Sequence, residues 1–420
     1  MPDRSPLRGR RVLLLAVGTR GDVEPAARLA HTLAGSGAKV CVTVLADGAD
    51  RVRRAGATPL VVGPPAAEAM WPSSPVARGI SHLNPGLHYL QQRARMAAGA
   101  GRLVGTVRPW LDRADVILSG LATARLVPVL RRAGLRAPAR LVLHAPLVPS
   151  PEGVSAWGRP PFDLLPPQIE DRRQRAMWRM TTGLSSASAR ALADLTDVAE
   201  ADWHDLLDDP LQPPLLTTSP VLDPDPSPAL LQTGPWADPT PTRGLPPDLD
   251  RWLAAHPGAI LLTLGSLPLT SPARQVARLL GAAADAGRPA VVQVSGHPPG
   301  PMAGGFVAAE VDHRALLPRV DAVLHHGGSG TTHAVTAHGI PQVVVPHLGD
   351  QGHYARRVHA LGLGPAPVPA ALAGRALLAR RIAQAVSDPG HRGRAALVAG
   401  SMRGEDGLTR AVEEIREMLA

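Results

Sequence analysis

The sequence predicts an α/β protein with two parallel sheets, and three observations lead to this fold class. Short apolar runs alternate with Ala-, Leu- and Arg-rich helical patterns, which is typical of parallel sheets covered by crossover helices. The alternation is interrupted by a proline-rich stretch and then begins again. The length of 420 residues is more than one ordinary core needs and suits two domains.

The first half of the chain predicts five buried strands, at residues 11–17, 39–45, 58–62, 116–119 and 140–143. Segments such as 25–35 and 122–133 have the composition of the helices between them. Residues 208–247 then hold twelve prolines, a density that breaks regular structure and stiffens a connection. Short strands are expected beside this stretch, at 215–218 and 230–233.

The second half predicts strands at 259–264, 290–294, 305–309, 322–325 and 342–345. Helices are expected at 273–286, 330–338, 351–361 and 370–387. The predicted organisation is an N-terminal domain (1–215), a linker (216–247), a C-terminal domain (248–402) and a closing helix (403–420). Because ligands of such sheets sit beyond the C-terminal ends of the strands, two facing sheets predict a cleft between the domains.

Composition excludes several classes of protein. The net charge of +9 comes from scattered arginines with a single lysine, Lys39, and no long basic run, so nucleic acid is not an expected partner. Any membrane contact is expected to be peripheral at most, because no run approaches about 18 apolar residues. The apolar run near the start is interpreted as a strand, not as a signal peptide. The single cysteine, Cys41, fits a reducing cytoplasm.

A glycine-rich turn carries the strongest chemical signal. The predicted strand ends at His325, the turn holds Gly327, Ser329 and Gly330, and Thr331 opens a helix. Glycines let several backbone N–H groups approach one ligand, and a helix N-terminus favours negative charge. We therefore expect a diphosphate site without lysine or metal. The P-loop pattern, the G-x-G-x-x-G spacing and zinc-type motifs are all absent, whereas a purely structural glycine turn stays open as an alternative.

Asp350 and Gln351 follow the next strand and stand at the start of a helix. A carboxylate and an amide side by side can hold neighbouring sugar hydroxyls. Helix capping by Asp350 is the alternative explanation.

Several motifs follow one another along the chain, namely GTRGDVEP (18–25), SPVLDPDP, QTGPW, LLTLGS, EVDHRALLPRVDAVLHHGGSGTT and RGEDGLTRAVEEI. Together they resemble the motifs of family 1 glycosyltransferases, especially the bacterial natural-product branch with its glycopeptide-antibiotic enzymes, and of the sterol glucosyltransferases. The resemblance runs through nearly the whole chain. It implies a GT-B fold, in which two Rossmann-like domains face each other across a cleft. It also implies a UDP- or dTDP-sugar donor that is a co-substrate, with no cofactor and no metal.

The resemblance further implies roles for single residues. The implied donor-binding residues are Ser266, Val311, His325, Gly327, Ser329, Gly330, Thr331, Asp350 and Gln351. Asp22 aligns with the catalytic base, which takes the proton of the acceptor hydroxyl in a single inverting displacement. Capping of the first helix is the alternative role for Asp22, and His82 or His88 is the alternative base.

Residues 64–110 and 150–182 interrupt the alternation, as insertions around an acceptor pocket would. They hold Trp71, His82, His88, Tyr89 and Trp157, which we take as candidate acceptor-binding residues, with ordinary core packing as the alternative.

These observations lead to an expected function: a cytoplasmic, inverting glycosyltransferase that modifies a small, largely apolar natural product such as a polyketide, macrocycle or peptide. Three alternatives stay open, namely a sterol or lipid glucosyltransferase, a catalytically weak nucleotide-sugar-binding partner protein, and a nucleotide-sugar epimerase. A homodimer is also left open.

Overall fold

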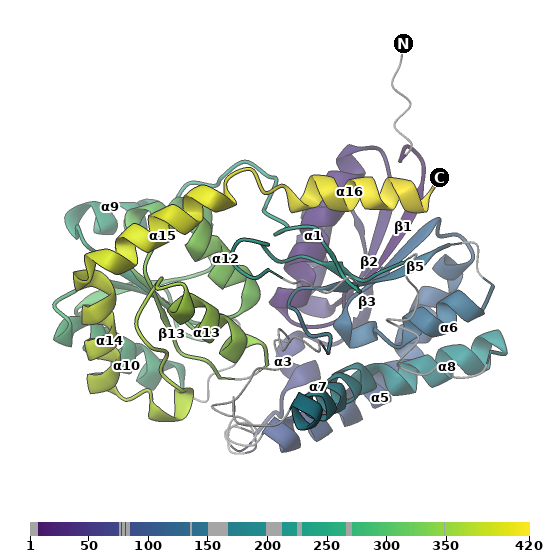
Figure 1. The fold of residues 1–420 in the computed structure, drawn as a ribbon, viewed down its shortest axis with the longest axis horizontal. Helices are drawn as coiled ribbons and strands as arrows, with labels where there is room; N and C mark the ends of the chain where they lie inside the picture. The colour runs from purple at the N-terminus through teal and green to yellow at the C-terminus, as the bar shows by residue number, and fades with distance from the viewer. Residues whose placement is uncertain are drawn as a thin grey trace, which may run out of the picture.

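The computed structural model describes residues 7–74, 77, 80, 85–134, 137–149, 167–198, 212–224, 229–265, 271–347 and 349–420. Two α/β domains lie side by side, each with a central sheet covered by helices (Figure 1). This arrangement confirms the predicted fold class. No helix among the described residues is both long and apolar enough to span a membrane.

The first sheet has seven parallel strands in the order β3-β2-β1-β4-β5-β6-β7. Their bounds are Arg11–Leu15 (β1), Lys39–Leu45 (β2), Thr58–Gly63 (β3), Val116–Ser119 (β4), Ala139–Leu143 (β5), Leu215–Leu216 (β6) and Leu231–Gln232 (β7). The first five strands lie where the alternating pattern predicted them. Strands β6 and β7 are shorter than predicted and extend this sheet, so the first part of the predicted linker belongs to the N-terminal domain.

Helices cover both faces of the first sheet. They are α1 (Arg20–Gly35), α2 (Ala49–Arg54), α3 (Ala66–Met70), α5 (Pro85–Leu111), α6 (Leu126–Arg132), α7 (Pro167–Thr182) and α8 (Ser186–Thr196). One face buries α1 against Val12 and Leu14, and the other buries the second half of α5 against Leu13 and Ile117. Val12 and Leu14 point to one face of the sheet and Leu13 points to the other, because successive side chains of a strand alternate between its two faces. The 27-residue helix α5 fills much of the interval that interrupted the predicted alternation.

The second sheet has six strands in the order β10-β11-β9-β8-β12-β13. The strands are β8 (Ile260–Thr263), β9 (Ala290–Gln293), β10 (Gly300–Met302), β11 (Gly305–Ala308), β12 (Val323–His325) and β13 (Gln342–Val344). Strand β10 pairs antiparallel with β11 and was not predicted. The turn between β10 and β11 contains Gly304, whose φ of +82° suits a tight reversal of the chain.

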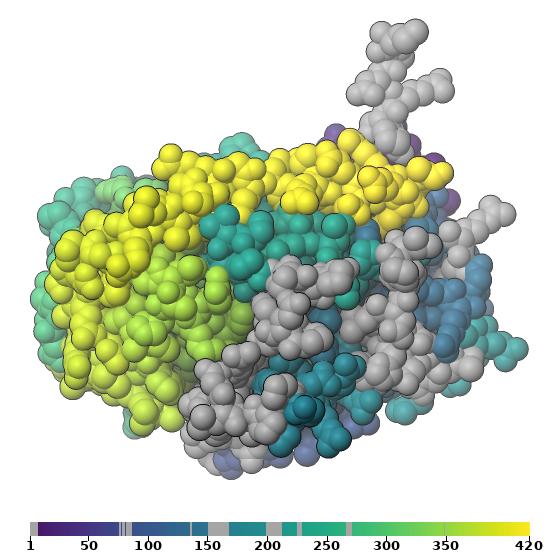
Figure 2. Space-filling view, in the orientation of Figure 1, coloured from purple at the N-terminus to yellow at the C-terminus, as the bar shows by residue number. Residues whose placement is uncertain are grey.

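The helices of the second half are α9 (Pro247–Ala255), α10 (Pro272–Asp285), α11 (His313–Leu316), α12 (Ser329–Ala337), α13 (Gln351–Ala360), α14 (Arg375–Ser387), α15 (Pro389–Met402) and α16 (Gly407–Met418). The last of these, α16, returns to the first domain, where Leu408, Ala411 and Ile415 pack in the same core as α1. Figures 1 and 2 show α15 and α16 as one yellow band across both domains. The closing helix therefore joins the two domains.

Both sheets reverse their strand order at a corresponding place. In the first sheet the reversal lies between β1 and β4, and in the second it lies between β8 and β12. The connections on the two sides of such a point run in opposite directions, which leaves a crevice at the C-terminal ends of the strands. Asp22 follows β1 and the glycine-rich turn follows β12, so each predicted site lies at the switch point of its own domain.

Candidate active site

Asp22 lies in the first turn of α1, where the backbone holds its carboxylate. Thr19 occupies the N-cap position, and Oδ2 of Asp22 accepts hydrogen bonds from the Thr19 backbone N–H (2.8 Å) and hydroxyl (3.3 Å). Gly18 makes this approach possible, because a Cβ there would stand 2.1 Å from Oδ2. Asp22 is thus not the N-cap residue itself, but its side chain does cap the helix. Only one carboxylate oxygen is used in this way.

Burial raises the pKa of Asp22 to about 6, against the opposing effect of the hydrogen bonds from Thr19. A carboxylate in water has a pKa near 4 and is a weak base at neutral pH. The higher pKa makes Asp22 a stronger base that is still ionised at pH 7. Helix capping and proton transfer are therefore compatible roles for this residue.

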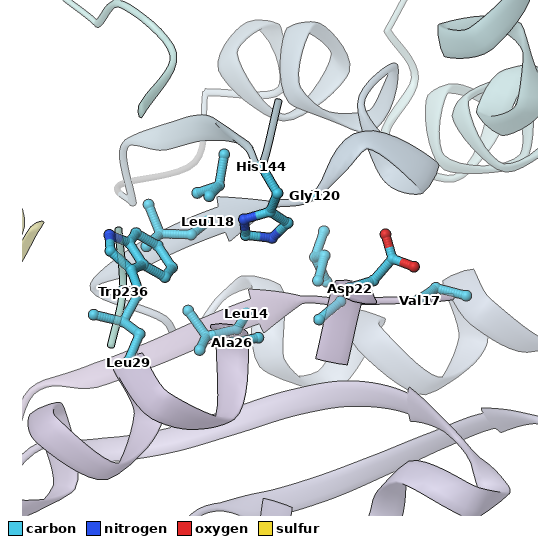
Figure 3. Close-up of a pocket in the computed structure, with 12 residues that line it drawn as sticks. Leu14, Val17, Asp22, Ala26, Leu29, Leu118, Gly120, His144 and Trp236 are labelled. Atoms are coloured by element: carbon cyan, nitrogen blue, oxygen red, sulfur yellow. The ribbon is translucent and has the colours of Figure 1, made fainter. Parts of the chain in front are cut away.

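Asp22 lines a small pocket at the C-terminal edge of the first sheet (Figure 3). The lining residues are Leu14, Leu15, Ala16, Val17, Asp22, Ala26, Leu29, Leu118, Gly120, Val142, His144 and Trp236. Sequence reasoning did not single out His144 or Trp236. His144 directly follows β5, and a survey of polar residues at strand ends would have found it. Trp236 follows β7, and no local signal connects it with a site about 200 residues earlier in the chain.

The glycine-rich segment of residues 325–331 is the candidate phosphate site, called the phosphate loop below, and it depends on two features that its sequence suggested. Gly327 has a φ of +87°, and a Cβ there would stand 2.8 Å from Val344 Cγ1 and 2.9 Å from the carbonyl oxygen of Gln351. Helix α12 begins at Ser329, and the N–H groups of residues 329–331 have no acceptor among the described residues. These N–H groups and the positive end of the helix dipole can bind an anion.

The His325 side chain makes different contacts from those expected. Its ring is fully buried, and Nδ1 accepts a hydrogen bond from the Gly327 N–H (3.1 Å) while Nε2 lies 2.9 Å from Oε1 of Gln342. Burial lowers its pKa to about 4, so the ring is neutral. Both nitrogens are engaged, so the expected donation from this ring to a phosphate oxygen is not available in this arrangement. His325 instead holds the turn in shape.

A chain of hydrogen bonds joins the phosphate loop to the Asp22 pocket. The Ser329 hydroxyl donates to the Tyr354 hydroxyl (3.0 Å), and Tyr354 donates to the carbonyl oxygen of His144 (3.4 Å). Tyr354 comes from α13 of the second domain, yet it is fully buried in the core of the first. Burial raises its pKa well above 10, so the hydroxyl stays protonated. The two predicted sites therefore adjoin each other across the domain interface.

Asp350 occupies the N-cap position of α13, but its side chain makes no capping hydrogen bond. Side-chain capping, the alternative explanation for this residue, is therefore not what the structure shows. Burial is the largest cause that raises its pKa to about 6, and the charges of Asp22 and Asp223 raise it further. The charge of Asp22 in the first domain therefore acts on Asp350 in the second. Gln351 is buried, and its Oε1 accepts the His347 N–H (2.8 Å).

The expected base-binding side of the donor site is joined to the first domain by an ion pair. Val311 is buried, and the preceding residue, Glu310, pairs with Arg51 (2.8 Å) and Arg20 (3.2 Å) of the first domain. The His313 ring, two positions after Val311, is held by Gln293, because its Nε2 lies 2.8 Å from Gln293 Oε1. Ser266 lies outside the described residues.

Of the candidate acceptor residues, Trp71, His88 and Tyr89 fall in the described part of the chain, and none of these three lines the Asp22 pocket. Trp71 and His88 stack on each other with ring centroids 4.3 Å apart, and the Tyr89 hydroxyl lies next to Gly183. His82 and Trp157 lie outside the described residues. An acceptor-binding role for these five residues stays a prediction. In the described part of the chain, no group of three His, Cys, Asp or Glu side chains is placed to hold a metal ion.

The fold, with its two adjoining sites, matches the GT-B fold of solved glycosyltransferases. The structure of the kitacinnamycin glycosyltransferase matches with a TM-score of 0.65 at 22% identity, over 98% of this chain and 100% of the other. The glycosyltransferase VinC, solved in complex with dTDP, matches with a TM-score of 0.61 at 20% identity, over 97% of this chain and 99% of the other.

Sequence comparison identifies the family. Residues 303–418 match the model described as "Erythromycin biosynthesis protein CIII-like, C-terminal domain". The vancomycin aglycone glucosyltransferase of Amycolatopsis orientalis is 30% identical over 424 aligned residues, which cover 94% of each chain. The chain therefore belongs to the natural-product branch of the family 1 glycosyltransferases.

Proposed function

We propose that this enzyme transfers a sugar from a UDP- or dTDP-sugar to a hydroxyl group of a small, largely apolar natural-product aglycone, with inversion and without a metal ion. The observation that carries the proposal is the connection from Ser329 through Tyr354 to His144, which sets the phosphate loop beside the Asp22 pocket. An anion site and a base at one interface suit a displacement in which a diphosphate leaves and a hydroxyl attacks.

In this mechanism the acceptor hydroxyl attacks the anomeric carbon as the bond from that carbon to the diphosphate breaks. Asp22 takes the hydroxyl proton, because its raised pKa favours the protonated product of that step. The negative charge that develops on the diphosphate is stabilised by the N–H groups at the start of α12. Asp350 and Gln351 hold the sugar hydroxyls in the proposed complex. One displacement inverts the anomeric configuration.

The relatives support this choice of substrates. The name of the Amycolatopsis relative specifies the vancomycin aglycone as acceptor, and the VinC structure is a complex with dTDP. The Asp22 pocket has an apolar lining apart from two ionisable side chains, as expected for an apolar acceptor with one reacting polar group.

A panel assay tests the proposal. The protein is incubated with UDP-glucose or dTDP-glucose and with a glycopeptide aglycone, a macrolide aglycone or a sterol, and mass spectrometry follows the products. We expect one aglycone to gain a hexose, diphosphate release that requires this acceptor, and the same rate in EDTA. Proton NMR of the product from the α-linked donor is expected to show a β-linkage.

Three outcomes contradict the proposal. Transfer to the sterol alone identifies a lipid glucosyltransferase instead. Diphosphate release that is independent of any acceptor identifies a hydrolase or an epimerase. Donor binding without turnover identifies a nucleotide-sugar-binding partner protein.

A further inference from the structure

The Asp22 pocket contains two ionisable side chains, Asp22 and His144, and otherwise a lining of aliphatic residues, glycine and Trp236. Trp236 does not offer its polar atom to the pocket, because its Nε1–H donates to the Thr233 hydroxyl (3.2 Å). Both His144 and Asp22 line this pocket, His144 from the end of β5 and Asp22 from the start of α1 (Figure 3). In an apolar pocket, such convergent polar groups determine where the polar part of a ligand lies.

Three neighbours fix His144. Its Nδ1 lies 2.9 Å from the Thr217 hydroxyl, its ring meets the Trp236 ring edge-on with centroids 6.0 Å apart, and its carbonyl oxygen accepts the Tyr354 hydroxyl. A side chain held at the ring, at one nitrogen and at the backbone loses little further freedom when it binds a ligand. The position of His144 is therefore preorganised.

The hydrogen bond to Thr217 also selects the tautomer. The Thr217 hydroxyl forms a hydrogen bond with Nδ1 of His144, and the described residues offer that hydroxyl no second hydrogen-bond partner. A buried hydroxyl needs an acceptor for its hydrogen, so Thr217 donates to Nδ1. In a neutral imidazole the ring hydrogen then stands on Nε2, for which the described residues supply no hydrogen-bond partner. His144 thus offers one N–H donor.

The charge state of His144 agrees with this arrangement. Burial, assisted by the positive charge of Arg28, lowers the pKa of His144 to about 4, so the ring is neutral at physiological pH. The pKa of Asp22 is about 6, which makes the carboxylate the stronger base of the two. The two side chains can therefore divide the work, with Asp22 accepting a proton and His144 donating a hydrogen bond.

We propose that His144 is a second catalytic residue of this enzyme, whose Nε2–H hydrogen-bonds the oxygen of the attacking acceptor hydroxyl and directs its proton toward Asp22. This inference rests on the proposed function. The acceptor oxygen forms its bond to the anomeric carbon, the bond from that carbon to the diphosphate breaks, and the proton moves to Asp22. His144 neither gains nor loses a proton in the step.

The test compares His144→Ala with His144→Gln, using the acceptor that the panel assay identifies. We expect His144→Ala to lower kcat/KM for the acceptor about 10- to 100-fold, because a hydrogen bond to the reacting oxygen is lost. His144→Gln keeps an N–H donor and is expected to recover most of this loss. In both variants UDP or dTDP binding, measured by calorimetry, should match the wild type, and the acid limb of the pH profile should stay near pH 6.

Thr217→Val serves as a matched variant for the tautomer. Without the Thr217 hydroxyl the ring hydrogen is free to move to Nδ1, so we expect kcat/KM for the acceptor to fall about 3- to 10-fold with donor binding unchanged. Thermal melting of each variant shows whether the fold is retained.

Four results would overturn the inference. The first is a kcat/KM for the acceptor that stays within twofold of wild type in His144→Ala, and the second is a folded His144→Gln variant that is no more active than His144→Ala. The third is a loss of donor affinity in His144→Ala as large as its loss of kcat/KM. The fourth is an acid limb of the pH profile that moves when His144 is replaced. The last result would make His144 the base. If the wild-type enzyme transfers sugar and His144→Ala does so with kcat/KM within twofold of wild type, only this inference fails. If the wild type transfers sugar to no acceptor, the proposed function fails and this inference fails with it.

Discussion

The phosphate loop takes its groups from one continuous segment, residues 325–331, whereas the Asp22 pocket gathers Asp22, His144 and Trp236 from three distant parts of the chain. The loop works through backbone N–H groups, so its requirements are for glycine and for a helix start. The pocket works through side chains that separate strands bring together. This difference teaches that the proposed donor site is local in sequence and that the proposed acceptor-activating site is not.

The largest expected effect concerns the pocket. Asp22→Asn removes the proposed base but keeps an oxygen that can accept the Thr19 N–H, so the start of α1 should stay intact. We expect kcat to fall about 100- to 10,000-fold, as for the loss of a general base. Steady-state kinetics measure this change, and calorimetry with UDP or dTDP should show unchanged donor affinity. Near-normal turnover would remove Asp22 from the mechanism and leave it a capping role alone.

The next effect concerns the loop. Gly327→Ala places a Cβ against Val344 and Gln351 in a left-handed backbone conformation, so the turn must shift. We expect UDP or dTDP to bind about 10- to 100-fold more weakly, and unfolding to require about 1–3 kcal/mol less free energy. Gly330→Ala is the matched control, because a Cβ there meets open space, and it should bind within about threefold of wild type. Equal behaviour of the two variants would contradict the backbone account.

A smaller effect links the pocket to stability. The pKa of Asp22 is higher in the folded protein (about 6) than in the unfolded chain (3.8), so the folded state binds the proton more tightly. This favours folding at low pH, and the advantage is lost as the pH rises from about 4 through 6. At pH 7.5, the free energy of unfolding of Asp22→Asn should therefore be about 1–3 kcal/mol higher than that of wild type, and this gain in stability should disappear near pH 4. Urea titrations at both pH values measure it.

The smallest effect concerns an ion-pair contact between the two domains. Glu310 is largely exposed, and its pairs with Arg51 and Arg20 are open to screening by salt. Glu310→Gln should weaken donor binding by about twofold or less, because exposed ion pairs contribute about 0–1 kcal/mol. Donor binding at low and high salt should differ less in this variant than in wild type. A tenfold loss would show that Glu310 contacts the donor itself.

The sequence by itself determined the α/β class, the positions of most strands and the phosphate loop. These features depend on short-range patterns: alternating apolar runs, a proline-rich connection, and glycines between a strand and a helix. Even there the sequence misjudged one detail, since His325 has both ring nitrogens engaged inside the protein. Whether a side chain points to a ligand depends on its neighbours, and Gln342 stands 17 positions further along the chain.

Only the tertiary structure placed His144 and Trp236 in one pocket with Asp22, and Thr217 and Tyr354 against His144. It did so through parallel strand pairing, which brings the ends of β1, β4 and β5 to one edge, and through α13, which inserts Tyr354 into the core of the first domain. The raised pKa of Asp22 and the lowered pKa of His144 arise from that burial. Burial is a property of the assembled fold, because segments far apart in the chain together exclude water from these groups.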